Sequence, residues 1–267
     1  MSEVTKTAVH LPATDADLEE IMRQDAGAGI SNRAADNLVP RIVLLQPLSP
    51  LVTRQGLVAG DFVIGEDSIA GATGFWFQPC YHDQLWLEFH PLDEGGGYVA
   101  SYPFGDEDRP PAGAEKYGQF KFRMRGSGNE LIHYRQFAGI VWRDRTGLEF
   151  VIPFKSTGHT VARDWNTRAN QVNRLPDGRA RALFGHVWHV TSVKVQRKQY
   201  TWFQIKVETP VLLDGSNAGP ANEIVGDYKT AYMRGRSLHA AFRDREKVGE
   251  IDVEPETERR DSEDVPF

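Results

Sequence analysis

The stretch "RALFGHVWHVTSVKVQRKQYTWFQIKVET", residues 181–209, decides the fold of this chain. Residues 181–196 and 200–209 are rich in β-branched and aromatic side chains, and the polar triplet "RKQ" separates them. Such runs are typical of strands, and a short polar break between two of them is typical of a hairpin. We therefore expect a long antiparallel strand pair here.

Shorter apolar runs bounded by Gly, Pro, Asn and Asp fill much of the remaining chain and read as strands. These runs are "PRIVLLQ", "GDFVIG", "TGFWFQPCY", "DQLWLEF", "GQFKFRMR", "ELIHYRQFAGIVW" and "GLEFVIPF". The segments "GSGN" and "RDRTG" suit hairpin turns, and "HD" at 82–83 predicts a further turn. The pattern predicts a mainly β (α+β) fold, an OB-like antiparallel barrel with extra helices.

Three segments predict helices: 14–24, 155–172 and 227–249. In the second, Ser156 or Thr157 is a candidate cap, and Val161, Trp165 and Ala169 recur at helical spacing. In the third, one apolar stripe consists of Tyr228, Ala231, Gly235, Leu238 and Phe242. The Gly- and Pro-rich stretches "DEGGGY", "GDEDRPPAGAEK" and "LDGSNAGPANE" predict loops.

The 267 residues are enough for one large core with extensions. We expect an N-terminal arm with a short helix at 1–35, a binding domain at 36–247 and a disordered acidic tail at 248–267. No apolar run is long enough to span a membrane, and the N-terminus lacks the features of a secretory signal. A single cysteine, Cys80, excludes a disulfide framework within the chain and fits a reducing compartment.

Charge is sorted along the chain in a way that the net value of −6 conceals. Residues 116–202 carry 16 basic and 5 acidic side chains, whereas residues 1–115 carry 6 basic and 18 acidic ones. The basic third also holds 13 aromatic residues. Cations interleaved with aromatic rings are what unpaired nucleic acid requires, because phosphates need charge and bases need flat surfaces.

Individual residues in the basic third form the candidate nucleic-acid site. In "QFKFRMR", Lys121, Arg123 and Arg125 alternate with apolar residues and predict a cationic strand face. The other candidates for phosphate contacts are Arg163, Arg168, Lys194, Arg197 and Lys198. Trp165 and Tyr200, which both have polar neighbours, are the candidates for base stacking.

Sequence motifs of common enzyme classes are missing from the chain. It contains no P-loop, no G-x-S-x-G, no H-E-x-x-H and no C-x-x-C. His186 and His189 fall on opposite faces of a strand, which disfavours a shared metal ion. We expect a binding protein without an enzyme activity, a cofactor or a metal ion.

The last residues, "DSEDVPF", combine acids with a terminal aromatic ring, which suggests an anchor for a partner's pocket with a basic rim. They resemble the C-terminal tip of bacterial single-stranded DNA-binding proteins, which recruits replication, recombination and repair proteins. The resemblance implies partner-binding roles for Asp261, Glu263, Asp264, Pro266 and Phe267.

The body resembles bacteriophage single-stranded DNA-binding proteins in the stretches "DAGAGISN", "LVPRIVLLQPLSP" and "FKSTGHTVARDWNTRANQV". The resemblance implies an OB-type barrel that protects single-stranded DNA in the host cytoplasm. A homo-oligomeric assembly is compatible with this expectation. Two alternatives stay open. One is a decoy with a mimic tail, or a virion protein, that binds host proteins and no DNA; the other is a DNA-annealing recombinase or a nuclease.

Overall fold

The computed structural model describes residues 39–248, apart from 72, 92–96, 105–108, 119–120, 172–173 and 176. Contacts within the chain divide it into two compact units, Met1–Asn37 and Leu38–Phe267, and the described residues belong to the second. The expected helix at 14–24 and the expected tail from residue 249 onward lie outside the described residues.

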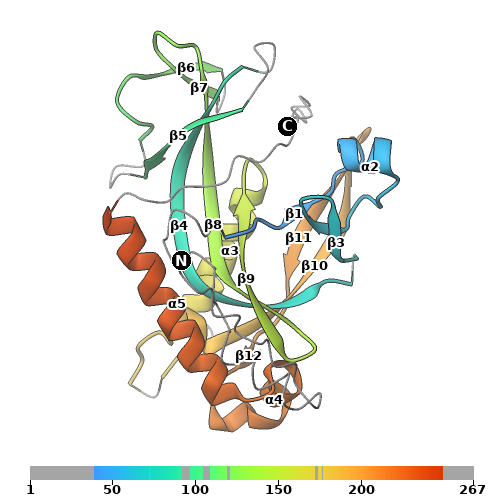
Figure 1. The fold of residues 1–267 in the computed structure, drawn as a ribbon, viewed down its shortest axis with the longest axis vertical. Helices are drawn as coiled ribbons and strands as arrows, with labels where there is room; N and C mark the ends of the chain where they lie inside the picture. The colour runs from blue at the N-terminus through green and yellow to red at the C-terminus, as the bar shows by residue number, and fades with distance from the viewer. Residues whose placement is uncertain are drawn as a thin grey trace, which may run out of the picture. The chain divides into compact units, whose positions relative to one another are not determined.

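Antiparallel strands dominate this unit (Figure 1). One sheet has three strands in the order β1-β2-β3. The other has nine, with the order β11-β10-β4-β8-β7-β6, while β12 pairs with β10, β5 with β4 and β9 with β8. The strands are β1 (Val43–Leu44), β2 (Phe62–Ile64), β3 (Asp67–Ala70), β4 (Phe75–Phe89), β5 (Tyr98–Pro103), β6 (Ala114–Gly118), β7 (Lys121–Met124), β8 (Glu130–Arg143), β9 (Thr146–Phe154), β10 (His186–Arg197), β11 (Tyr200–Val207) and β12 (Val211–Leu212).

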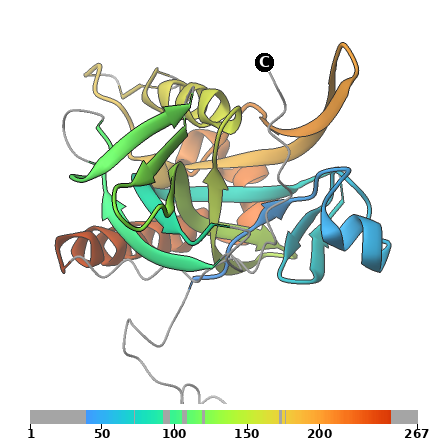
Figure 2. The ribbon, with the colours of Figure 1, turned by 90° about the horizontal axis from the view of Figure 1, so that it is seen from above.

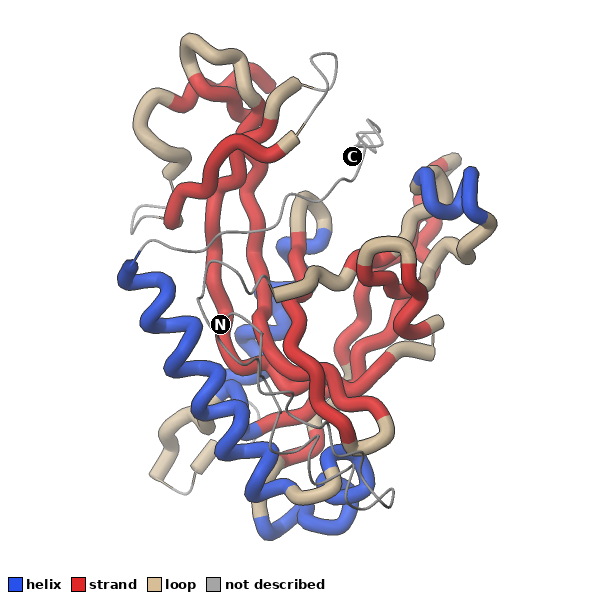
Figure 3. Tube along the Cα trace, in the orientation of Figure 1, coloured by secondary structure: helices blue, strands red, loops and turns tan. Residues whose placement is uncertain are grey.

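Helices are fewer and lie around the sheets (Figure 3). The α-helices are α2 (Pro50–Gln55), α3 (Gly158–Gln171), α4 (Ala218–Val225) and α5 (Tyr228–Val248), and short 3-10 turns occur at η3 (Leu183–Gly185) and η4 (Gly215–Asn217). Helix α5 is 21 residues long. Among the described residues, no helix is both long enough and apolar enough to cross a lipid bilayer.

The two long strands β4 and β8 form the spine of the larger sheet. They pair from Trp76 opposite Trp142 to Phe89 opposite Glu130, with a bulge at Cys80. The turn expected at 82–83 was wrong, because β8 supplies hydrogen-bonding partners along that part of β4 and this pairing overrides the local preference for a turn. At the bulge, a Cβ atom on Gly139 would lie 2.2 Å from the carbonyl oxygen of Gln78, so only glycine fits.

Each face of the sheet carries its own core. On one face, α3 and β2 pack over the sheet and bury Phe62, Phe77, Phe137, Trp165 and Trp188. On the other face, α4 and α5 cover Cys80, Ile140, Val187 and Phe242, among others. The stripe expected on the closing helix is confirmed, since Ala231, Gly235, Leu238 and Phe242 are buried and Tyr228 packs against the same core.

Helix α5 is tied to the sheet through one buried amide. Gln78 donates from Nε2 to the carbonyl oxygens of Phe184 and Ala231, at 2.8 and 3.0 Å. Its Oε1 accepts from the indole N–H of Trp142 at 3.0 Å. Because three polar groups are satisfied by one side chain, the sheet and the helix are held in a single register.

The expectation of a mainly β (α+β) fold is confirmed, but the described strands do not close into a barrel. Their main path ends at β11 on one side and at β6 on the other. The stretch "LDGSNAGPANE" is also more ordered than expected, since it contains η4 and most of α4. Pro220 lies within the first turn of α4, where its missing N–H costs nothing.

Candidate nucleic-acid interface

The strand pair predicted at 181–209 extends beyond the rest of the sheet as a curved hairpin (Figure 2). We call its residues 191–206 the arm. Thr191 lies opposite Lys206, and Arg197 lies opposite Tyr200. The turn between the strands is the pair Lys198 and Gln199, and Lys198 takes a positive φ of 54°. The predicted hairpin and its polar turn are therefore confirmed.

One face of the arm, the inner face, rests on the small sheet. Ser192 Oγ donates to the carbonyl oxygen of Gly60 at 2.6 Å. Gly60 has a φ of +97°, and a Cβ there would lie 2.5 Å from the ring of Phe203. The Gln46 amide accepts from the Phe203 N–H at 2.9 Å and donates to its carbonyl oxygen at 3.1 Å. These contacts anchor the half of the arm that lies nearest to the sheet.

The opposite face, the outer face, carries alternating residues of both strands. Cross-strand partners share a face, so Arg197 lies beside Tyr200 and Val195 lies beside Trp202. Lys206 follows on the same face of β11, four residues after Trp202. No acidic residue occurs between 191 and 206. The outer face thus presents two cations and two aromatic rings on one surface.

The base of the outer face is where the first acid appears. Glu208 Oε2 lies 3.3 Å from His189 Nδ1, and Glu208 Oε1 lies 3.5 Å from Lys206 Nζ. The hydrogen bond from His189 lowers the pKa of Glu208. The His189 ring in turn lies 4.9 Å from the Trp76 ring, measured between centroids. His189 therefore links the base of the outer face to β4.

The four predicted residues of the arm do not all face the same way. Arg197 and Tyr200 are on the outer face, and Lys198 is in the turn. Lys194 pairs with Phe203 and so belongs to the inner face, where it is nevertheless exposed. Trp202 and Lys206 were not predicted as site residues. They lie two and six residues after Tyr200, and even spacing along a strand places residues on the same face. This spacing is the sequence signal that could have identified them.

The β6–β7 rim, residues 114–125, holds the predicted row of Lys121, Arg123 and Arg125, all of which are exposed. The row itself contains no acid, but the neighbouring strand β6 supplies one in Glu115. Arg123 Nε lies 2.7 Å from a Glu115 oxygen, and Arg125 Nε lies 3.5 Å from the other. The Arg123 hydrogen bond lowers the pKa of Glu115. The rim and the arm join opposite ends of the spine, since β7 pairs with β8 at Glu130 and Leu131 whereas β10 pairs with β4 from Phe75 to Phe77.

Helix α3 contributes mainly to the core. Trp165 is 1% exposed, and its ring stacks on Phe137 with centroids 4.3 Å apart. This burial leaves no ring face for a base, so the stacking role predicted for Trp165 is not supported. Arg168 donates to the carbonyl oxygens of Val207 and Glu208, at 2.6 and 2.8 Å, and is thereby committed to holding the end of β11.

The other predicted site residues lie on α3 or outside the described residues. Arg163 is exposed on α3. The predicted partner-binding residues, from Asp261 to Phe267, lie outside the described residues. Within the described part of the chain, no three His, Cys, Asp or Glu side chains gather into a set that could hold a metal ion.

Comparison with known proteins gives one match. Residues 11–248 match the model of the Pam3 phage gp34-like protein family. No curated protein and no solved structure matches the chain. The match spans most of the sequence and includes all of the described residues. The chain therefore belongs to the Pam3 phage gp34-like protein family, a family of bacteriophage proteins.

Proposed function

We propose that this phage protein binds single-stranded DNA on the outer face of the arm, without sequence preference and without chemistry. One observation carries the proposal: Arg197, Tyr200, Trp202 and Lys206 share one strand face, in a segment that contains no acid. Arginine and lysine neutralise phosphates, while the tyrosine and tryptophan rings stack on bases of any sequence.

The way in which the arm is supported favours binding over a passive role. Its inner face is held by Ser192, Gln46 and Phe203, so its outer face is preorganised. Preorganised side chains lose little conformational entropy when a flexible strand binds to them. An aromatic and cationic face on a strand pair held in this way suits a ligand whose own bases are unpaired.

The second half of the proposal concerns partners. The resemblance of "DSEDVPF" to the tips of bacterial single-stranded DNA-binding proteins supports a role in recruiting replication, recombination or repair proteins of the host cytoplasm. Acids next to an aromatic residue suit a hydrophobic pocket with a basic rim. The DNA-binding half and the recruiting half rest on separate observations.

A mobility-shift assay with labelled oligo-dT and with a duplex of equal length, each with and without magnesium, tests the DNA-binding half. We expect the single strand to shift, to stay intact and to bind more tightly than the duplex. The absence of any shift would favour a decoy or virion protein, and magnesium-dependent cleavage would identify a nuclease.

A matched pair of variants locates the binding surface. Arg197→Ala with Lys206→Ala removes two cations of the outer face and should weaken binding to oligo-dT. Arg236→Ala with Lys229→Ala removes the same charges from exposed positions of α5 and should leave binding nearly unchanged. Equal losses in both variants would mean that net charge, and not the arm, determines affinity.

A further inference from the structure

A second group of polar and aromatic side chains lies on the spine, away from the arm. His82, Gln84 and Trp86 alternate along β4 and therefore share a face. Opposite them on β8 lie Phe137, Arg135 and His133, in that order. We call His82, Gln84, Trp86 and His133 the polar array.

Every member of the polar array has a buried polar atom without a hydrogen-bond partner among the described residues. These atoms are His82 Nε2, Gln84 Oε1, Trp86 Nε1 and His133 Nε2. The next residue along the face behaves differently, because Glu88 accepts from Tyr102 at 2.5 Å and from Asn129 at 2.6 Å. Buried polar groups are normally satisfied, so four neighbouring exceptions indicate a missing partner.

The rings of this region are already stacked on one another. The Phe104 ring lies 4.4 Å from the His133 ring at an interplanar angle of 12°. On the Trp86 side, the His133 and Trp86 rings lie 5.1 Å apart at 27°. His159, from the start of α3, meets His133 edge-on at 4.5 Å. Planar groups of this kind favour a flat ligand.

The histidines of this region are uncharged near neutral pH. Burial, followed by the charge of Arg135, lowers the pKa of His82 to about 4. Burial, with smaller contributions from His159 and Arg135, lowers the pKa of His133 to about 3. A neutral imidazole offers one donor and one acceptor. The polar array is therefore suited to hydrogen bonding with a neutral ligand.

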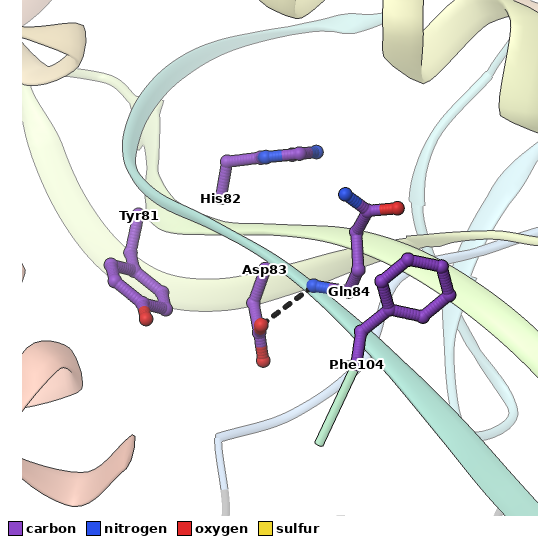
Figure 4. A pocket seen from close by; sticks show the side chains of 5 residues that line it. All are labelled: Tyr81, His82, Asp83, Gln84 and Phe104. Carbon is purple, nitrogen blue, oxygen red and sulfur yellow. Dashed lines mark hydrogen bonds between the residues drawn. The ribbon is translucent and has the colours of Figure 1, made fainter. Parts of the chain in front are cut away.

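A pocket adjoins the polar array at the edge of β4 (Figure 4). It is lined by Tyr81, His82, Asp83, Gln84 and Phe104 and has a volume of about 170 Å³. In Figure 4, His82 and Gln84 project from one side of the strand, and Phe104 approaches Gln84. One water needs only about 10–15 Å³ of such space, so the pocket has room for a larger group.

We propose that the polar array and this pocket form a second binding site, which takes one planar, neutral nucleobase. The base comes either from an unpaired nucleotide of a strand or from a free nucleoside. An amino or imide N–H of the base would donate to Gln84 Oε1, and a carbonyl oxygen or ring nitrogen would accept from His82 Nε2, since His82 and Gln84 are the members of the polar array that line the pocket. The proposal does not depend on DNA binding by the arm.

A nucleobase fits these groups better than other small ligands do. Its edge alternates donors and acceptors, as the orphaned atoms require, and its faces match the neighbouring rings. An anion would find only Arg135 as a cation among the six paired positions. Ordered water is the competing occupant, since water also satisfies buried polar atoms without stacking on rings.

Histidine side-chain NMR on the full chain tests the proposal. Thymidine, deoxyadenosine and oligo-dT are added in separate titrations, and the imidazole signals of His82 and His133 are followed. A shift with the nucleosides assigns the site to free bases, and a shift with oligo-dT alone assigns it to bases within a strand. If none of these ligands moves either signal, the site holds water and the proposal is wrong.

Variants separate this site from the arm. Gln84→Met keeps the volume and removes the acceptor, so it should weaken base binding about three- to tenfold. His133→Phe keeps an aromatic ring for stacking and removes the ring nitrogens, so it should also weaken base binding. The arm variant Arg197→Ala with Lys206→Ala should leave nucleoside binding unchanged. If a folded Gln84→Met protein binds thymidine, deoxyadenosine and oligo-dT at this site as tightly as the intact chain does, the proposal is wrong. Binding of oligo-dT at the arm does not affect this conclusion.

Discussion

The arm and the β6–β7 rim look alike in sequence and differ in the strands beside them. In both, cations alternate with apolar or aromatic residues along one strand. On the rim, the position opposite Arg123 is Glu115, and the two form an ion pair at 2.7 Å. On the arm, the position opposite Arg197 is Tyr200, and the segment contains no acid.

The residues of the neighbouring strand therefore determine how much of the charge in a row of cations can interact with a ligand. A cross-strand acid uses part of a cation's interaction capacity before any ligand arrives, whereas a cross-strand aromatic ring adds a surface for stacking. The proposed DNA-binding surface is therefore the arm and not the rim, and the experiments below test that proposal.

The largest effect concerns Trp165 of α3, whose burial in the core removes it from the binding surface that the arm and the rim could offer. Trp165→Ala should lower the free energy of unfolding by about 3–5 kcal/mol, because it leaves a cavity between Phe137 and Trp188. Affinity for oligo-dT, measured well below the melting temperature, should remain. A large loss of affinity in the folded variant would return Trp165 to the binding site.

Removing the cations of the arm should have the next largest effect. Changing Arg197, Lys198 and Lys206 together to Ala should cost about 3 kcal/mol of binding free energy at low salt. The log–log salt dependence should flatten by about two units, since each phosphate contact contributes about 0.7. Fluorescence anisotropy over a range of salt concentrations measures both quantities, and an unchanged slope would contradict the assignment.

Single rings on the arm should matter slightly less. Trp202→Ala and Tyr200→Ala should each cost about 1–3 kcal/mol of single-strand affinity if the ring stacks on a base. Both side chains are only partly buried, so melting temperatures should change little. Loss of stability with intact affinity would show that these rings belong to the core.

The same triple change on the rim supplies the contrast. Lys121, Arg123 and Arg125 changed together to Ala should flatten the salt dependence by less than about one unit, because Glu115 already neutralises part of their charge. A loss as large as that of the arm variant would break the comparison and place DNA on both surfaces.

The smallest effect is a dependence on pH. The pKa of Glu115 is lowered by Arg123, so the ion pair is intact above the ordinary carboxylate range and is lost as the pH falls through the lowered value. Protonation releases Arg123 and Arg125, and the rim should then contribute more to binding. The difference in affinity between the intact chain and the rim variant should therefore be larger below the lowered pKa of Glu115 than at pH 7.

Elements whose signal is local could be predicted from the sequence. The hairpin at 181–209, helix α3 and the buried stripe of α5 all follow from periodicity and turn residues. The continuity of β4 could not be predicted, because its turn-like residues 82–83 are held by a partner more than 50 residues away. The barrel expectation rested on a resemblance, and the pairing of the described strands does not support it.

The candidate site also contains features that local sequence predicts and features that depend on pairing with distant strands. The alternation that exposes Lys121 and Arg123 was visible in one strand, but the pairing with Glu115 depends on β6. Trp165 lies at helical spacing from Val161 and Ala169, which is the pattern of a buried stripe, and its polar neighbours concealed this. The residues of the polar array come from β4 and β8, which pair in space but lie far apart in the sequence. No single segment of the sequence therefore indicates the array.

The bulged residue Cys80 can serve as an intrinsic chemical probe of local opening at the centre of the sheet. It is the only cysteine, its side chain is fully buried, and burial raises the pKa of its thiol well above the usual range. Thiol reagents attack the thiolate, so they can react only when the spine opens locally or the whole unit unfolds. If reclosing is faster than the reaction, the rate of modification at increasing denaturant reports the free energy of opening at the centre of the sheet, in the native chain and without any engineered probe.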